Sequence, residues 1–263
     1  MASSPASIMA SIGALALSAA LLSPAQAQVP QVQARKEPAV AAAAREAAGA
    51  LRLSLDQIAK TGRRPDYSTA PLADQFSRVF DVKDLTALPP AQAGDLPWLM
   101  DWGDAANGAF KAIQFFGIAP PVTLLADAAA LQRNAADYED QEAAAADFLL
   151  RLFAREMQAA LAFSDQLTPA QRTPVRMEGL YKMRVADAEI VRSDLIWTTA
   201  VKPANARLIS AAIRATGAVW ATAILPADRP AIADALAAAE AAAKDDDSRG
   251  NLASFAALLT NAK

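Results

Sequence analysis

Carboxylates are the side chains of this sequence whose types and spacing could do chemistry. Five acidic residues lie within the eleven-residue stretch DYEDQEAAAAD, residues 137–147, between apolar segments. Such a cluster could hold a divalent cation, supply acid–base catalysis, or form the solvated face of a helix. The positions that these residues take on a helix distinguish the three possibilities.

A helix over residues 131–163 gathers its large apolar side chains on one face, because a helix repeats about every 3.6 residues. That face is formed by Leu131, Tyr138, Leu149, Leu152, Phe153 and Phe163. Asp140 and Asp147 point away from it, so we expect both in water. Asp147 is also placed to pair with Arg151, four residues later. Most of the cluster is therefore predicted to be solvated.

Glu142 and Glu156 are the exceptions, because both fall within the apolar face. They lie fourteen residues apart, which is roughly 21 Å along a helix, so they cannot share one metal ion. The helix expected over residues 175–200 carries Arg192 inside its apolar stripe and Arg184 at the edge of that stripe. Since buried charges are nearly always paired, we predict a buried polar network in which one of these arginines meets one of the glutamates.

Two residue types that carry much enzyme chemistry are missing, since the sequence has no Cys and no His. The missing Cys removes disulfides, thiolate nucleophiles and zinc ribbons, and the missing His removes the commonest general base and transition-metal ligand. The sequence also lacks a G-x-S-x-G nucleophile motif, a Gly-rich nucleotide loop and an EF-hand loop. We therefore predict no metal and no cofactor, and we assign no catalytic residue.

The net charge of −3, without a basic patch, argues against nucleic acid as a partner. Trp98, Trp102 and Phe110 could instead mark a helix that lies on a membrane surface. The polar face of that helix is acidic, however, which is unsuited to anionic lipid. We predict that these aromatic side chains pack in the core.

The first 27 residues have the features of a signal peptide. Residues 8–22 form an apolar run, which is shorter than the about 20 residues that a transmembrane helix needs. Pro24 breaks this run, and Ala25 and Ala27 then supply the small side chains that signal peptidase requires. We predict cleavage between Ala27 and Gln28.

One feature departs from that pattern, because no Lys or Arg precedes Arg35 and the basic start of a signal peptide is missing. The alternative is an uncleaved anchor, or an apolar helix docked on the domain. We predict a signal peptide over residues 1–27, a flexible lead over residues 28–37 and a single domain over residues 38–263. The mature protein is expected to be periplasmic or secreted, with no stable membrane span.

The mature chain is rich in Ala and poor in Gly, which favours helices almost throughout. Apolar periodicity and Pro or Gly stops predict helices over residues 38–61, about 72–80, 96–116, 122–167 with a bend near 134–138, 175–200, 204–225, 229–244 and 251–261. We therefore predict an all-α fold, an Ala-rich bundle of seven or eight helices.

Local signals predict how some of these helices begin. Asp95 and Asp228 are candidate N-caps for the helices that follow them. Residues 84–97 contain several Pro residues and are expected to form an irregular connector. The acidic run of residues 245–247 is expected to break the chain before the last helix.

A charge register is predicted for the helices before and after Pro203. The short connector makes them antiparallel neighbours, in which facing residues have a constant index sum. Asp194 with Arg207, and Asp187 with Arg214, give the same sum. We expect both pairs to form at the rim of the interface.

Three functional hypotheses follow. The first is a non-catalytic binding or scaffolding protein, with an unknown protein or a small apolar ligand as its partner. The second is a periplasmic hydrolase that acts through carboxylates, whose spacing would set its mechanism. The third is a bundle that binds apolar ligands or acts as a chaperone, with a cavity among Trp102, Phe110, Phe153 and Trp197.

Overall fold

A computed structural model describes residues 33–119, 122 and 127–262, which form α-helices, two short 3-10 helices and no strand. The α-helices are α1 (Ala39–Lys60), α2 (Leu72–Val79), α3 (Val82–Ala87), α4 (Leu96–Gln114), α5 (Ala128–Asp137), α6 (Glu139–Asp165), α7 (Pro174–Thr198), α8 (Pro203–Ala223), α9 (Arg229–Ala242) and α10 (Asp246–Asn261). The 3-10 helices are η4 (Ala93–Asp95) and η5 (Pro169–Gln171). The all-α class is confirmed, but these ten α-helices exceed the predicted seven or eight. The signal peptide lies outside the described residues.

Most long helices end near the Pro and Gly residues from which their ends were predicted. The helical region expected over residues 122–167 is indeed divided, because α5 ends at Asp137 and α6 begins at Glu139. Pro174, Pro203 and Pro230 each occupy a first-turn position, where the missing N–H of Pro leaves no bond unmade.

Three local predictions are wrong in part. The irregular connector expected over residues 84–97 overlaps α3, which Asp81 caps by accepting from the backbone N–H groups of Lys83 and Asp84. Asp228 holds the N-cap position of α9, but its side chain accepts no capping bond. The chain does break before the last helix, but that helix begins at Asp246, within the acidic run, rather than near residue 251.

Asp95 also departs from its predicted role as the cap of α4. Its Oδ2 accepts from the backbone N–H of Gln92 and from Nη1 of Arg35, each at 2.9 Å, and its Oδ1 accepts from the indole of Trp98. The backbone N–H of Arg35 also donates to the carbonyl of Gly94. The end of the predicted flexible lead is therefore tied to η4.

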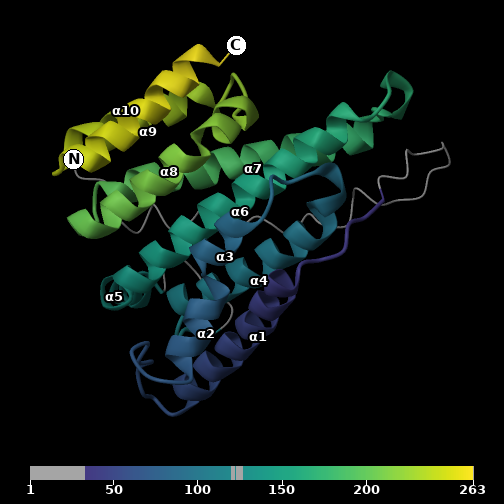
Figure 1. Ribbon diagram of the computed structural model, residues 1–263. Coiled ribbons are helices and arrows are strands. Elements are labelled where there is room, and N and C mark those ends of the chain that lie inside the picture. Colours follow the sequence, from purple (N-terminus) through teal and green to yellow (C-terminus); the bar gives the residue numbers. More distant parts are fainter. Residues whose placement is uncertain (1–32, 120–121, 123–126, 263) are drawn as a thin grey trace.

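Helix α6 lies at the centre of the molecule, between two groups of helices (Figure 1). On one side it packs against α4, which in turn carries α1, and α1 carries α2. On the other side it packs against α8 and α7, and these carry α10 and α9. Because neighbours cover it on several sides, α6 buries fifteen of its 27 residues. A helix in such a position must be apolar nearly all round.

The aromatic residues of α4 pack in the core, as predicted. Trp102 is 1% exposed and contacts the rings of Trp98 and Phe148, at centroid distances of 6.4 and 5.7 Å. Phe110 and Phe153 are also buried in this core, and Trp197 packs at its edge. Among the helices of the described residues, none combines the length and the apolar content needed to cross a membrane.

The capping role of Asp245 yields a first prediction. Its carboxylate accepts from the backbone N–H and the hydroxyl of Ser248, each at 2.9 Å, and from Nε of Arg207. We expect Asp245→Ala to lower the free energy of unfolding by about 1 kcal/mol, the usual cost of losing an N-cap. Asp246→Ala is the matched control, since it removes a fully exposed charge from the same turn. Urea unfolding of both variants measures the difference, and equal losses would contradict the capping role.

Candidate functional site

The two arginines of the predicted polar network do not reach the two glutamates. Arg192 pairs with Glu189 on its own helix through two hydrogen bonds, one of them 2.8 Å from Nε to Oε2. Arg184 instead donates to the backbone carbonyls of Thr222 and Ala223 at the end of α8. The predicted pairing is therefore wrong, because both arginines find acceptors nearer the surface.

Glu142 is buried completely, with 0% exposure, and neither carboxyl oxygen has a hydrogen-bond partner. Burial, with the charge of Glu139, raises the pKa of Glu142 to about 8. The hydroxyl of Tyr67 is also buried without a partner, and burial raises the pKa of that phenol, with smaller contributions from Tyr138 and Glu142. The ring of Tyr67 packs edge-on against Tyr138, at 5.9 Å. Glu142 is therefore a protonated carboxylic acid in an aromatic environment at neutral pH.

Glu156 lies at the crossing of α6 with α4, where a glycine makes room for it. A Cβ atom at Gly103 would lie 2.0 Å from Oε1 of Glu156, a distance at which atoms clash. Glu156 is 7% exposed, and its Oε1 has no hydrogen-bond partner. Burial raises the pKa of Glu156 well above its usual range, and the charges of Asp187 on α7 and Asp104 on α4 raise it further. Carboxyl groups on two other helices thus act on Glu156 here.

Asp187 and Asp194 are buried on α7, and sequence reasoning placed them at the rim. They are 3% and 6% exposed, and Oδ2 of Asp187 has no hydrogen-bond partner. Burial raises the pKa of Asp187 well above its usual range and that of Asp194 to about 8. Their burial could have been predicted from their positions directly before Ala188 and Leu195, two apolar residues that are themselves buried in this half of α7.

The predicted register between α7 and α8 is also wrong. The two helices are neighbours, but the arginines of α8 turn toward α10 on its other side. Arg207 pairs with Asp245, at 3.3 Å, and Arg214 donates to Oδ1 of Asn251, at 3.2 Å. The index sum fixes which residues lie level, but it does not fix which face of α8 carries the arginines.

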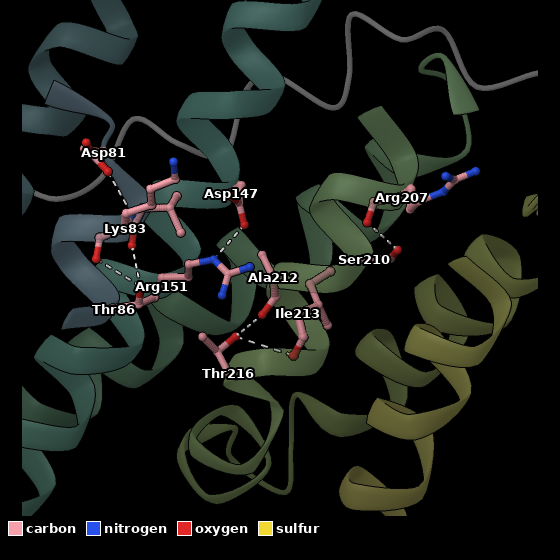
Figure 2. A network of polar contacts seen from close by, with 11 residues as sticks. Asp81, Lys83, Thr86, Asp147, Arg151, Arg207, Ser210, Ala212, Ile213 and Thr216 are labelled. Carbon is pink, nitrogen blue, oxygen red and sulfur yellow. Dashed lines mark hydrogen bonds and ion pairs between the residues drawn. The ribbon is translucent and has the colours of Figure 1, made fainter. Parts of the chain in front are cut away.

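Asp147 differs from the other buried acids because a cation compensates it. Figure 2 shows Nε of Arg151 donating to Oδ1 of Asp147, at 2.7 Å, beside α8. This pair was predicted, although Asp147 was expected in water and is 5% exposed. Burial raises the pKa of Asp147, and the charge of Arg151 opposes that shift. The error arose because Ala residues hide a second buried face of α6 from a periodicity argument.

The exposed end of the acidic cluster holds the connector between α7 and α8. Oε1 of Glu139 accepts from the backbone N–H of Lys202 and from the side-chain amide of Asn205. Asp140 accepts from the same amide and from Nζ of Lys202, at 2.8 and 3.0 Å. Asp140 is solvated, as predicted, and the pair of acids has a structural role.

The buried acids do not form a recognisable metal centre. Within residues 33–119, 122 and 127–262, no three acidic side chains gather closely enough to hold an ion. Glu156 and Asp187 resemble an acid–base pair in the direction of their pKa shifts, as catalytic carboxyls often do. With 7% and 3% of their surface exposed, however, they offer no substrate a place to bind.

An open recess lies instead at the far end of the molecule, between the end of α1 and the start of α2. Its volume is about 350 Å³. It is lined by Ser54, Gln57, Ile58, Thr61, Arg63, Arg64, Asp66, Thr69, Ala70, Pro71 and Leu72. Sequence reasoning described part of this segment only as a loop. Arg63 and Arg64 are visible as a basic pair in the sequence. Their proximity to apolar residues, however, depends on the turn between α1 and α2.

A second pocket lies where α7 leaves α6 and has a volume of only about 20 Å³. It is lined mainly by apolar side chains, among them Leu96, Phe163, Met177 and Met183. That volume suits about one water molecule rather than a ligand. Neither pocket is lined by Trp102, Phe110, Phe153 or Trp197, around which the apolar cavity was expected.

Comparisons of this chain with known protein families, with curated proteins and with solved structures found no match.

The buried acids predict an unusual dependence of stability on pH. A carboxyl whose pKa is raised on folding holds its proton in the native state and loses it in the unfolded state. Its stabilising effect is complete below the unfolded pKa, near 4, and is lost as pH rises through the folded pKa, about 8 for Glu142 and Asp194. We therefore expect the melting temperature to fall as pH rises from 4 to 8.

Each group changes the free energy of unfolding by roughly 1 kcal/mol per pH unit within that window. Glu142→Gln, which keeps the shape of the protonated acid, should reduce the slope of stability against pH. Asp140→Asn is the control, because Asp140 is solvated and its pKa is lowered. A wild-type melting temperature that rises between pH 5 and pH 8 would contradict the protonated state of these acids.

Proposed function

We propose that this chain is a non-catalytic binding protein that acts in the periplasm or outside the cell. The observation that carries the proposal is the recess of about 350 Å³ between α1 and α2, which brings guanidinium, hydroxyl and apolar groups together. Its volume falls within the range of small-molecule sites, about 300–1,000 Å³. The ligand that fits this lining is a small anion, a carboxylate or phosphate, with a short apolar group.

Charge favours an anion at the mouth of the recess. Arg64 pairs with Asp137 at 2.8 Å, which holds its guanidinium in place while leaving it 69% exposed. Arg63 is exposed, and no ion pair to its guanidinium is recorded within the described part of the chain. Asp66 is the one acid of the lining, and its Oδ1 already accepts from the backbone and hydroxyl of Ser68.

The floor of the recess suits a short apolar group. Ile58 is half-buried, Leu72 is buried, and Ala70 and Pro71 complete an apolar wall. An arginine contacts an anion through several N–H groups in a fixed plane, so the anionic head of a ligand is oriented while its apolar part meets this wall.

A carboxylate-based hydrolase is the second candidate, because Glu156 and Asp187 lie close enough for the charge of one to raise the pKa of the other. Their burial places this pair inside the core rather than in a cleft. A substrate would have to separate α6 from α7 before it reached either group. Binding in the recess requires no such opening.

Ligand binding can be tested with hexanoate, and with hexanol and inorganic phosphate as separate probes of the apolar and anionic contributions. We expect hexanoate to shift the amide NMR signals of residues 61–72 more strongly than either probe alone. Arg63→Ala should weaken hexanoate binding by roughly tenfold, the loss of one charge-assisted hydrogen bond of about 1.4 kcal/mol.

Arg78→Ala is the matched control for that experiment, since Arg78 is an exposed arginine on α2 that does not line the recess. It should leave the affinity for hexanoate unchanged. Equal effects of the two substitutions, or shifts spread over the whole molecule, would count against the recess as the binding site. A phosphate effect as large as that of hexanoate would identify a simple anion site without an apolar requirement.

Export provides an independent test of the proposed location. We expect the precursor to be cleaved between Ala27 and Gln28, so that N-terminal sequencing of the mature product begins at Gln28. Ala27→Phe should block cleavage, because signal peptidase requires a small residue there. Recovery of residues 8–22 in a cytoplasmic form of the wild-type protein would overturn the proposal of export.

A further inference from the structure

Helix α7 has two halves with different environments, and Asp187 marks the boundary. No residue of α7 before Asp187 is fully buried, whereas eight residues from Asp187 to Thr198 are buried. The first half leaves Val175 and Tyr181 exposed, at 56% and 57%. In Figure 1 this half runs beside the end of α6 toward the edge of the molecule. Asp187 is therefore the first fully buried side chain of α7.

The carboxyl group of Asp187 lies near a second buried carboxyl group, that of Glu156 on α6. Glu156 on α6 lies close enough to Asp187 to feel its charge, and Gly103 on α4 leaves the space that Oε1 of Glu156 occupies. Both Oε1 of Glu156 and Oδ2 of Asp187 are buried without a hydrogen-bond partner. Two ionised carboxylates in such a place would repel each other and lack solvation. The packing of α7 on α6 thus requires that at least one of them hold a proton.

The basic groups of α8 and α9 do not neutralise this pair. Arg207 and Arg214, the basic residues of α8, turn to Asp245 and Asn251 on or before α10. Arg229, the one basic residue of α9, donates to the carbonyl of Ala262. The other charged residues of α9 are the acids Asp234 and Glu240.

The remaining neighbours add acid or direct their cations elsewhere. On α4, Asp104 raises the pKa of Glu156, Asp101 lies 4.0 Å from Arg45, and Lys111 is in the last turn. On α6 itself, Arg155 donates to the carbonyl of Pro89. At η4, Asp95 pairs with Arg35.

Several other charges of α6 and α7 are engaged, but Asp194 on α7 is a further buried acid, whose pKa burial raises to about 8. Arg151 pairs with Asp147, and α3 contributes Lys83 and Asp84 near its first turn. On α7, Lys182 pairs with Glu178, Arg192 with Glu189, and Arg184 donates to backbone carbonyls.

We propose that Glu156 and Asp187 form a pH-sensitive latch, which holds the first half of α7 on the bundle when protonated and releases it when ionised. Release exposes the apolar side chains that α7 and α6 now share, among them Met177, Leu180 and Met183. Burial of both groups places their titration above that of ordinary carboxyls, so the latch is closed in acid and opens as pH rises. This device is independent of the recess between α1 and α2.

Hydrogen exchange followed by mass spectrometry or NMR tests the latch on the whole protein. After correction for the intrinsic rise of exchange with pH, we expect protection factors in residues 178–190 to fall by roughly tenfold or more from pH 5 to pH 8. The variants Glu156→Gln and Asp187→Asn carry neutral side chains of the same shape. In both, this fall should be reduced at least severalfold.

Glu142→Gln is the matched control, since Glu142 is also a buried acid on α6 and lies fourteen residues before Glu156. This substitution should change the dependence of global stability on pH. It should leave the fall of the protection factors in residues 178–190 unaltered. An α7 whose protection is constant from pH 5 to pH 8, or whose loss is the same in all three variants, overturns the latch.

Carbon-13 NMR of the carboxyl groups supplies a measurement that needs no variant to fold. In the wild-type protein the carboxyl signal of Asp187 or Glu156 should titrate with the same midpoint as the loss of protection. A pair that stays in one ionisation state throughout this range also overturns the proposal.

Discussion

The burial of α6 on several sides is the constraint on which the rest of the structure depends. A helix that contacts α4 on one side and α7 and α8 on the other cannot keep a wide polar face. Its many Ala residues allow those neighbours to approach closely, and its Phe and Leu residues fill the space between them. Every charged residue on α6 must then be paired, be exposed at an end, or give up its charge.

The acids of α6 and α7 illustrate these three outcomes. Asp147 is paired with Arg151, and Asp140 lies at the exposed start of the helix. Glu142 and Glu156 form no ion pair within the described residues, and burial raises the pKa of both, which favours their neutral forms. Exposed charged side chains gather instead in the recess between the end of α1 and the start of α2.

The sequence predicted the fold class and most helix ends, because these depend on local features such as Pro at first-turn positions and Gly stops. It also predicted that Glu142 and Glu156 would be buried. It did not predict their partners, because the arginines of α7 are flexible enough to reach backbone carbonyls or a glutamate on the same helix. Asp187 and Asp194 were predicted at the rim because a helical wheel gives only the direction in which each side chain points. It does not show how many neighbouring helices pack against that side of α7. The recess was missed because it forms only when residues on either side of a turn come together.

The contact between Gly103 and Glu156 also limits how this sequence can change. A side chain at position 103 would occupy the space of the Glu156 carboxyl, since even a methyl group would lie 2.0 Å from Oε1. Enlarging residue 103 is therefore tolerable only after residue 156 has become smaller. Shortening residue 156 first leaves an unfilled volume beside a glycine, which weakens packing until the second change occurs. The two positions are thus expected to vary together in any lineage that preserves this helix crossing, and the order of substitutions is constrained by sterics as well as by charge.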